Sequence, residues 1–213
     1  MLSKIGNMLV KHVKNNSSTY FALFLVFITG LSAGAFTVNG LSAMQRDELT
    51  HYFQGFLQLF DNQQVDNVEL LKLSMMENLK IVAVLWILGV TIIGIPFIYL
   101  IIGIRGFITG FASGFLVEAL GFKGVLFTLL TLFPKEIIFV PCIIALGVNG
   151  INFSLNIIKS RSAKHLFKES LRTSFLAYCF VTLFYSCFIL GGIFLEAYIT
   201  PVVIRIISPI IAN

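Results

Sequence analysis

The sequence predicts an all-α protein: a polytopic integral membrane helical bundle of about five spans, with broken helices. Three observations lead to this fold class. Hydrophobic residues make up 57% of the 213 residues. Charged residues make up only 12%, about half of the ~25% that is usual in soluble domains. Long stretches carry no charge at all, and a stretch of ~20 apolar residues is enough to cross the hydrocarbon of a bilayer.

The first predicted span covers residues 19–38. The segment before it, residues 1–18, is polar and contains three lysines but no acidic residue. The apolar run is too long for the core of a cleaved signal peptide, so we interpret it as a retained anchor. Because lysine and arginine in short segments beside a span stay in the cytoplasm, we expect a cytoplasmic N-terminus.

Residues 39–80 form a predicted extracytoplasmic loop with six acidic and three basic residues. Apolar side chains in this loop recur at helical spacing on one face, which predicts an amphipathic helix. Such a helix either packs back onto the bundle or lies in the membrane interface as a docking surface for an extracytoplasmic partner. The candidate partner contacts on this face are Phe53, Phe56 and Phe60.

The second and third spans are predicted at 81–103 and 107–133. No charged residue occurs between Ile81 and Ile104, and Arg105 then marks a very short cytoplasmic turn. The third span has two alternatives: one broken crossing, or a full crossing followed by a re-entrant piece on the outer side. Both alternatives return the chain to the extracytoplasmic side before the fourth span.

The fourth and fifth spans are predicted at 137–158 and 174–195. Between them, residues 159–172 contain five basic residues and one acidic residue, which predicts a cytoplasmic loop. The last apolar piece, 199–212, contains two prolines and is short for a crossing. We expect it at the outer surface or tucked into the bundle, with an extracytoplasmic C-terminus; a sixth crossing is the alternative. The whole chain, 1–213, is interpreted as a single membrane domain.

Glycine and proline mark the expected helix breaks. Broken helices are typical of transporters, in which the ends of half-helices bind the substrate near the middle of the membrane. Transport also usually needs ionisable groups deep in the membrane, and the sequence offers one clear case, Glu118, with Lys123 near enough to pair with it. A small-solute transporter or channel is therefore the alternative function. The expected breaks are at Gly94, Pro96, Gly121, Gly124, Pro134 and Pro141.

Five glycines repeat at a spacing of four residues in two of the spans. Small residues at this spacing let two helix backbones approach closely, which is how helices associate in lipid. The contact is either within one bundle or with another subunit or membrane partner, so a homo-oligomer is one of the expected arrangements. The helix-packing candidates are Gly30, Gly34, Gly106, Gly110 and Gly114.

Enzyme functions find little support in the sequence. The histidines His12, His51 and His165 all fall in polar segments, so no embedded base is present for an intramembrane serine protease. No H-E-x-x-H zinc motif occurs. The basic 159–172 loop is interpreted as a topology signal and a contact for membrane lipid rather than nucleic acid. The sequence therefore predicts no catalytic, cofactor-binding or metal site.

Four blocks of the sequence resemble the stage II sporulation protein M family. They are N-L-K-I-V-A-V-L-W-I-L-G at 78–89, G-I-P at 94–96, R-G-F-I-T-G-F-A-S-G-F at 105–115 and P-K-E-I-I-F-V-P at 134–141. Wider relatives outside sporulation often carry P-H-G-x-x-E-L-P at the last block. This chain has Lys135, Glu136 and Phe139 where those relatives have His, Gly and Glu, so we expect their embedded ionisable pair to be lost here.

The resemblance implies a non-enzymatic membrane scaffold of the sporulation engulfment complex. Such a scaffold recruits two peptidoglycan-degrading partners, the stage II sporulation proteins D and P. The implied location is the mother-cell side of the sporulation septum in a spore-forming bacterium. The spans would contact the membrane anchors of the partners, and the 39–80 loop would contact their wall-facing domains. No cofactor is implied.

Overall fold

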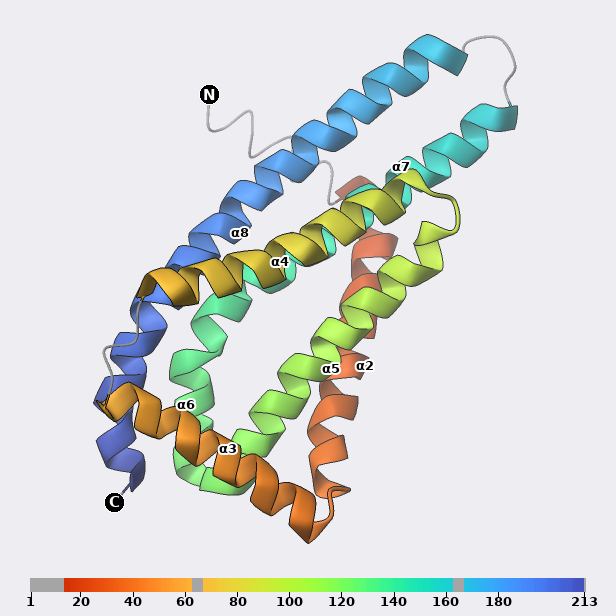
Figure 1. The fold of residues 1–213 in the computed structure, drawn as a ribbon. Coiled ribbons are helices and arrows are strands. Elements are labelled where there is room, and N and C mark those ends of the chain that lie inside the picture. The colour runs from red at the N-terminus through yellow and green to blue at the C-terminus, as the bar shows by residue number, and fades with distance from the viewer. Residues whose placement is uncertain (1–13, 63–66, 163–166, 213) are drawn as a thin grey trace.

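The computed structural model describes the backbone of residues 14–62, 67–162 and 167–212. Within these ranges, the side chains of 56–62, 160–162, 167–171 and 207–212 are outside the description. The described part of the chain is almost entirely helical and contains no strand (Figure 1). The helices are α2 (Ser17–Asn39), α3 (Ala43–Asn62), α4 (Asn67–Val90), α5 (Gly94–Leu120), α6 (Phe122–Thr131), α7 (Phe133–Ser162) and α8 (Phe167–Ala212).

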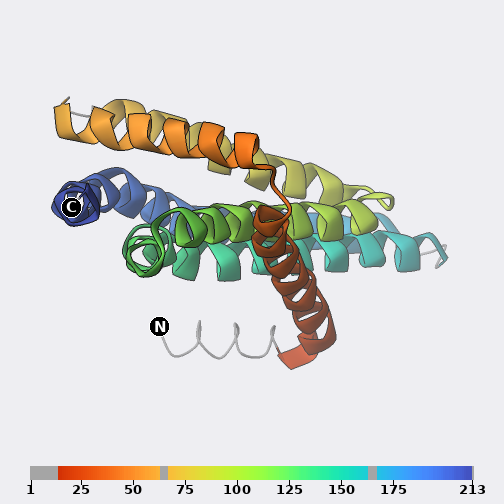
Figure 2. The same cartoon turned by 90° about the horizontal axis from the view of Figure 1, so that it is seen from below.

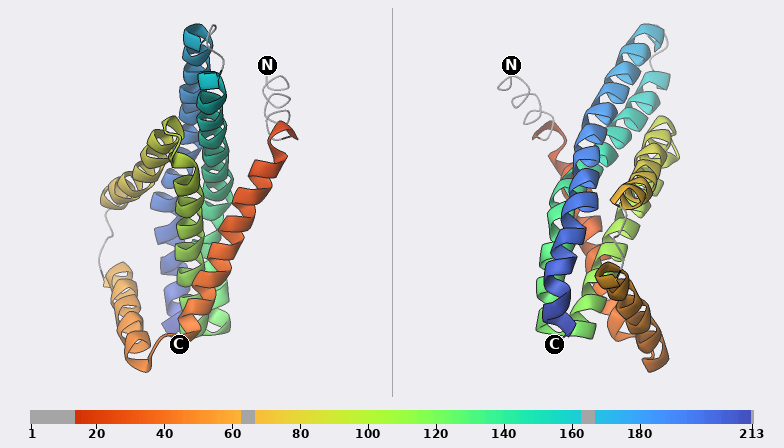
Figure 3. Two further views of the ribbon diagram at one scale, coloured as in Figure 1. Left: turned by 90° about the vertical axis from the view of Figure 1, so that its right-hand side faces the viewer. Right: turned by 60° about the vertical axis from the view of Figure 1, so that its left-hand side comes forward.

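Five of these helices, α2, α4, α5, α7 and α8, are long and apolar enough to cross a membrane. The predicted all-α membrane bundle of about five spans is therefore confirmed. The α4–α5 turn and the facing ends of α7 and α8 lie at one end of the bundle (Figure 3). The α2–α3 connection, the α5–α6 turn and the end of α8 lie at the other. Which end is cytoplasmic stays a prediction from the charge pattern.

The turn predicted at Arg105 is wrong. The chain turns at residues 91–93 instead, and α5 runs uninterrupted through Arg105. The Thr91 hydroxyl caps the Leu88 carbonyl at 2.9 Å, and a Cβ at Gly94 would overlap that same carbonyl. Pro96 follows in the first turn of α5, where its missing N–H has no helical partner to lose.

Hydroxyl groups from distant helices also reach the backbone carbonyls at this turn. The Ser154 hydroxyl of α7 lies 2.8 Å from the Gly89 carbonyl and 2.9 Å from the Thr91 carbonyl. The Tyr178 hydroxyl of α8 donates to the Trp86 carbonyl at 2.8 Å. These hydrogen bonds from α7 and α8 hold the turn at this place.

For the 107–133 region, the alternative of a full-length helix followed by a re-entrant piece describes the structure better than a single broken crossing. Helix α5 is long and apolar enough for a full crossing. It ends at Gly121, the one residue of positive φ among those described (φ 60°). A side chain would strain this conformation. Helix α6 then turns back along α5, and Gly124 lies inside it, where a Cβ would overlap the Leu116 carbonyl. Leu132 alone separates α6 from α7, so Pro134 lies in the first turn of α7.

Two helices continue without a break through positions where the sequence predicts an interruption. Helix α7 continues through Pro141, because neighbouring helices can hold a membrane helix whose backbone bond a proline has removed. Helix α8 continues through Pro201 to Ala212. The 199–212 piece is therefore neither a separate surface segment nor a sixth crossing, but the end of the fifth spanning helix.

Helix α7 forms the centre of the bundle. In the most apolar stretch of α7, 72% is buried inside the protein. In the corresponding stretches of the other four spans, 33% or less is buried. Its residues Phe139, Ile143 and Leu146 pack in one core with Leu23 of α2 and Ile98 of α5. Figure 2 shows α3 and α4 together on one side of the bundle, with α2 on the other. Helix α3 runs across the lower ends of its neighbours (Figure 1).

Candidate functional site

The first turn of α7 carries two charged residues, and each forms an ion pair with a different helix. The Lys135 ammonium lies 2.6 Å from Glu196 Oε1 of α8. The Ser74 hydroxyl of α4 donates to the other oxygen of Glu196 at 2.5 Å. Asn78, one turn along α4, donates to the Ser74 carbonyl at 2.8 Å. This half of the network ties together α4, α7 and α8.

The second ion pair joins α7 to α5. The Arg105 guanidinium lies 3.4 Å from Glu136 Oε1, and both side chains are largely buried. The Thr109 hydroxyl lies 3.4 Å from the same oxygen, and the guanidinium stands 5.8 Å from the centre of the Phe139 ring. Arg105 is about 17 Å and 23 Å from the two ends of α5 at 1.5 Å per residue. The pair therefore lies near the middle of a spanning helix.

The His and Glu of the wider relatives are absent, as the sequence shows, but the site still carries charges, since Lys135 and Glu136 both form largely buried ion pairs. Two cations face two carboxylates, so the network is neutral as a whole. Three atoms within it, Asn78 Oδ1, Arg105 Nε and Glu136 Oε2, are buried without a hydrogen-bond partner. Each carboxylate is held by a cation from another helix, so the arrangement ties α5, α7 and α8 together.

Glu118 is not the deep ionisable group that the sequence suggested. It lies two residues before the end of α5 and pairs with Arg46 of α3. Its side chain is 29% exposed and that of Arg46 is 40% exposed. Arg46 also donates to the Asn39 carbonyl at 3.1 Å. This ion pair attaches α3 to α5 at the end of the bundle, where α3 crosses it.

Phe53 provides the apolar contact between α3 and the bundle. Its ring meets Phe115 of α5 and Phe127 of α6 edge to face, with ring centres 6.4 and 5.7 Å apart. It packs against a small cluster formed by Leu116, Phe127 and Ile204. Phe53 is thus engaged with the bundle. The side chains of Phe56 and Phe60, the other two expected partner contacts, lie outside the described residues.

We expect Phe53→Ala to release α3 from the bundle while the spans stay folded. The edge-to-face pairs and the lost burial together contribute about 1–2 kcal/mol. Amide hydrogen exchange in α3 should therefore accelerate about tenfold, with little change in α5. Tyr52→Ala is the matched control, because Tyr52 is 71% exposed. Equal acceleration in both variants would contradict a specific role for Phe53.

The five repeated glycines lie on one contact between α2 and α5, and the contact is reciprocal. A Cβ at Gly30 or Gly34 would overlap the α5 carbonyls of Gly103 and Phe107. A Cβ at Gly106 or Gly110 would overlap the α2 carbonyls of Phe27 and Leu31, respectively. At Gly114 it would stand 3.0 Å from the Cα of Ala35. The glycine spacing allowed packing within one bundle or against another protein, and the structure shows packing within one bundle.

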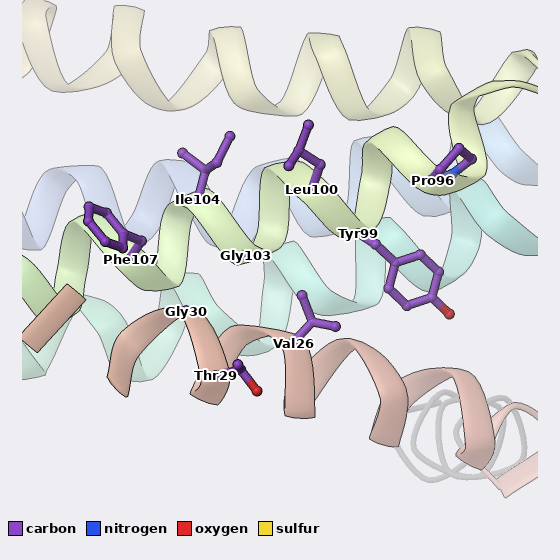
Figure 4. A pocket seen from close by; sticks show the side chains of 9 residues that line it. All are labelled: Val26, Thr29, Gly30, Pro96, Tyr99, Leu100, Gly103, Ile104 and Phe107. Atoms are coloured by element: carbon purple, nitrogen blue, oxygen red, sulfur yellow. The ribbon is translucent and has the colours of Figure 1, made fainter. Parts of the chain in front are cut away.

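An apolar groove runs beside this contact, open to the outside of the bundle (Figure 4). Its floor includes Gly30 and Gly103, and a Cβ at Gly103 would meet only the Val26 side chain, at 3.3 Å. Leu100 and Ile104 of α5 stand along one wall. Two similar apolar grooves lie between α2 and α7 and between α4 and α8. Three faces of the bundle are therefore shaped to receive long apolar groups.

Residues 23–201 match the family model described as stage II sporulation protein M. The chain belongs to this family. No curated protein and no solved structure matches the chain. Family membership, together with the five apolar helices, makes the chain a sporulation-related multi-pass membrane protein.

This member of the stage II sporulation protein M family carries one site that its sequence did not reveal. Glu196 follows the predicted end of the fifth span, Leu195, and accepts hydrogen bonds from two helices. A single acidic residue inside an otherwise apolar stretch is the signal that could have found it, because embedded charges mark functional or structural sites. Among the described residues, no group of three or more His, Cys, Asp or Glu side chains is placed to hold a metal ion.

Proposed function

We propose that this protein is a non-enzymatic membrane scaffold of the sporulation engulfment complex. In this role it recruits and positions the peptidoglycan-degrading stage II sporulation proteins D and P on the mother-cell side of the septal membrane. Its own contribution is shape: it holds the partners' membrane anchors while their catalytic domains act on the wall. Family membership supports the sporulation context.

The observation that carries the proposal is the distribution of polar and apolar surface. The embedded charges of α5, α7 and α8 are paired inside the bundle, whereas three grooves open outward with apolar linings. A single spanning helix of a partner would fit such a groove, since a glycine floor allows close backbone approach. The groove between α2 and α5 has this floor at Gly103, where a Cβ would meet only the Val26 side chain.

Copurification tests the proposal. The partner of the protein P type should remain with this protein through extraction in mild detergent. Filling the groove with Leu100→Trp should lower its recovery about tenfold, equivalent to ~1.4 kcal/mol of binding. Ile108→Trp is the matched control, because Ile108 has the same exposure on α5, 56% against 55%, but does not line the groove. Failure to recover either partner with the unaltered protein would refute the scaffold role.

A second candidate function is transport of a small solute. It is favoured by the discontinuity between α6 and α7, which places the charged first turn of α7 beside the middle of α5. Glu136 Oε2 and Asn78 Oδ1 are buried without a hydrogen-bond partner, and unpaired polar groups of this kind are what a substrate pathway would use. Solute flux into proteoliposomes containing only this protein distinguishes the two functions, since a scaffold conducts none.

A further inference from the structure

The groove between α2 and α7 differs from the groove between α2 and α5 in the residues that line it. It has a volume of about 490 Å³, within the ~300–1,000 Å³ that is usual for ligand pockets. Phe21 and Phe24 form its α2 wall and are 64% and 47% exposed. Val140, Pro141 and Ile144 form its α7 wall. No glycine is among the described residues that line it, so a partner helix would have no floor for close backbone approach.

The groove has a polar end at the start of α2. Ser17, the first residue of α2, lines this end and is exposed. Lys14 precedes Ser17 by three residues, so their Cα atoms are at most ~11 Å apart at ~3.6 Å per residue. Lys14 is exposed and has no ion-pair partner among the described residues. Figure 3 shows that the start of α2 leans away from α7. An exposed cation and a hydroxyl therefore lie beside one end of a mainly apolar groove.

No acidic residue near this end opposes the cation. Residues 1–18 contain three lysines but no aspartate or glutamate, and none of the described residues that line the groove is acidic. A ligand that neutralises Lys14 therefore has to carry the negative charge itself. The charge pattern predicts that this end of α2 is cytoplasmic, and the cytoplasmic leaflet is the one that carries anionic lipids.

We propose that this groove binds one acyl chain of an anionic phospholipid, with the lipid phosphate at Lys14 and Ser17. An acyl chain is flexible and much thinner than an α-helix, whose diameter is about 10–12 Å, so it can follow a groove walled by aromatic rings. The groups along the groove are a cation, a hydroxyl and then apolar side chains, which matches the order of groups in a phospholipid. The inference does not depend on the scaffold role, because it concerns another groove and a lipid rather than a protein.

Fluorescence quenching by brominated lipids tests this site. In a chain whose single tryptophan is removed by Trp86→Phe, Phe24→Trp places a reporter on the groove wall. The protein is reconstituted into vesicles of equal parts brominated phosphatidylglycerol and ordinary phosphatidylcholine, and into the mixture with the bromine on the other lipid. Because a basic residue near the membrane surface attracts anionic lipid, phosphatidylglycerol should occupy the groove about fivefold more often than phosphatidylcholine. The ratio of quenching in the two mixtures measures this preference.

Phe36→Trp is the matched control, because Phe36 also lies on α2 and is 74% exposed but does not line the groove. The two lipids should quench equally there. Lys14→Gln should abolish the preference at position 24, whereas Lys14→Arg should keep it. The proposal is overturned if the preference at position 24 is absent, is as large at position 36, or survives Lys14→Gln. Lack of quenching at position 24 by either lipid would also overturn it, because a protein segment would then cover the groove.

Discussion

Replacing Gly110 by leucine is expected to separate α2 from α5 and to lower the melting temperature in detergent by about 6–12 °C. Even a Cβ at this position would overlap the backbone carbonyl of Leu31, and a backbone atom cannot move aside as a side-chain end can. Forcing extra volume into a packed contact costs about 3 kcal/mol or more at its upper range, and each kcal/mol is worth roughly 2–4 °C for a chain of this size. Thermal denaturation followed by size-exclusion chromatography measures the effect.

Gly191→Leu is the matched control for this experiment. Gly191 also lies in a spanning helix, α8, but a Cβ built on it would have no atom of a neighbouring helix within 4 Å. The same side chain should therefore be tolerated there with almost no change in melting temperature. If the two variants denatured together, backbone contact at Gly110 would not be what holds α2 in place.

Glu196→Leu is expected to destabilise the bundle by about 3–5 kcal/mol, because it leaves Lys135 embedded without its counter-ion. Both side chains of this pair are 19% exposed, so water can screen them only in part. The Ser74 hydroxyl would lose its acceptor as well. Unfolding of the purified protein in mixed micelles, with a denaturing detergent as the variable, measures the loss of free energy.

The double variant Lys135→Met/Glu196→Leu should recover most of that stability. Removing both charges removes the need to pair them, and apolar residues of similar volume can fill the space. Glu118→Leu is the control for a pair at the end of the bundle, where exposed ion pairs contribute at most ~1 kcal/mol. Additive losses in the double variant, or an equal loss at Glu118, would show that the Lys135–Glu196 pair is not energetically coupled.

Two errors in the sequence prediction come from embedded charges. Arg105 predicts a turn, and Glu196 lies just past the predicted end of the fifth span, but in the structure both lie within helices of the bundle. Other errors come from proline, because α7 continues through Pro141 and α8 continues through Pro201. The two turns at 91–93 and at Gly121 are formed by uncharged residues. They include threonine and glycine, and at the first turn a proline follows.

The candidate site was therefore only partly visible in advance. The glycine repeats that bring α2 against α5 follow from a local spacing of four residues, and so does the apolar face of α3 that includes Phe53. The charge network does not, because Lys135 and Glu196 are separated by 61 residues. No pattern within one helix says that a cation on another helix will meet its carboxylate.

Residue pattern alone was sufficient for the all-helical fold, the number of spanning helices and the close helix contact through glycine. These properties depend on quantities that act locally along the chain: the transfer of side chains from water to lipid, the rise per residue and the absence of a Cβ. The positions of the α4–α5 turn, the continuity of α8 and the pairing of the embedded charges came from the packed bundle. Whether a charge or a free carbonyl is tolerated in an apolar interior depends on the partner that packing brings to it.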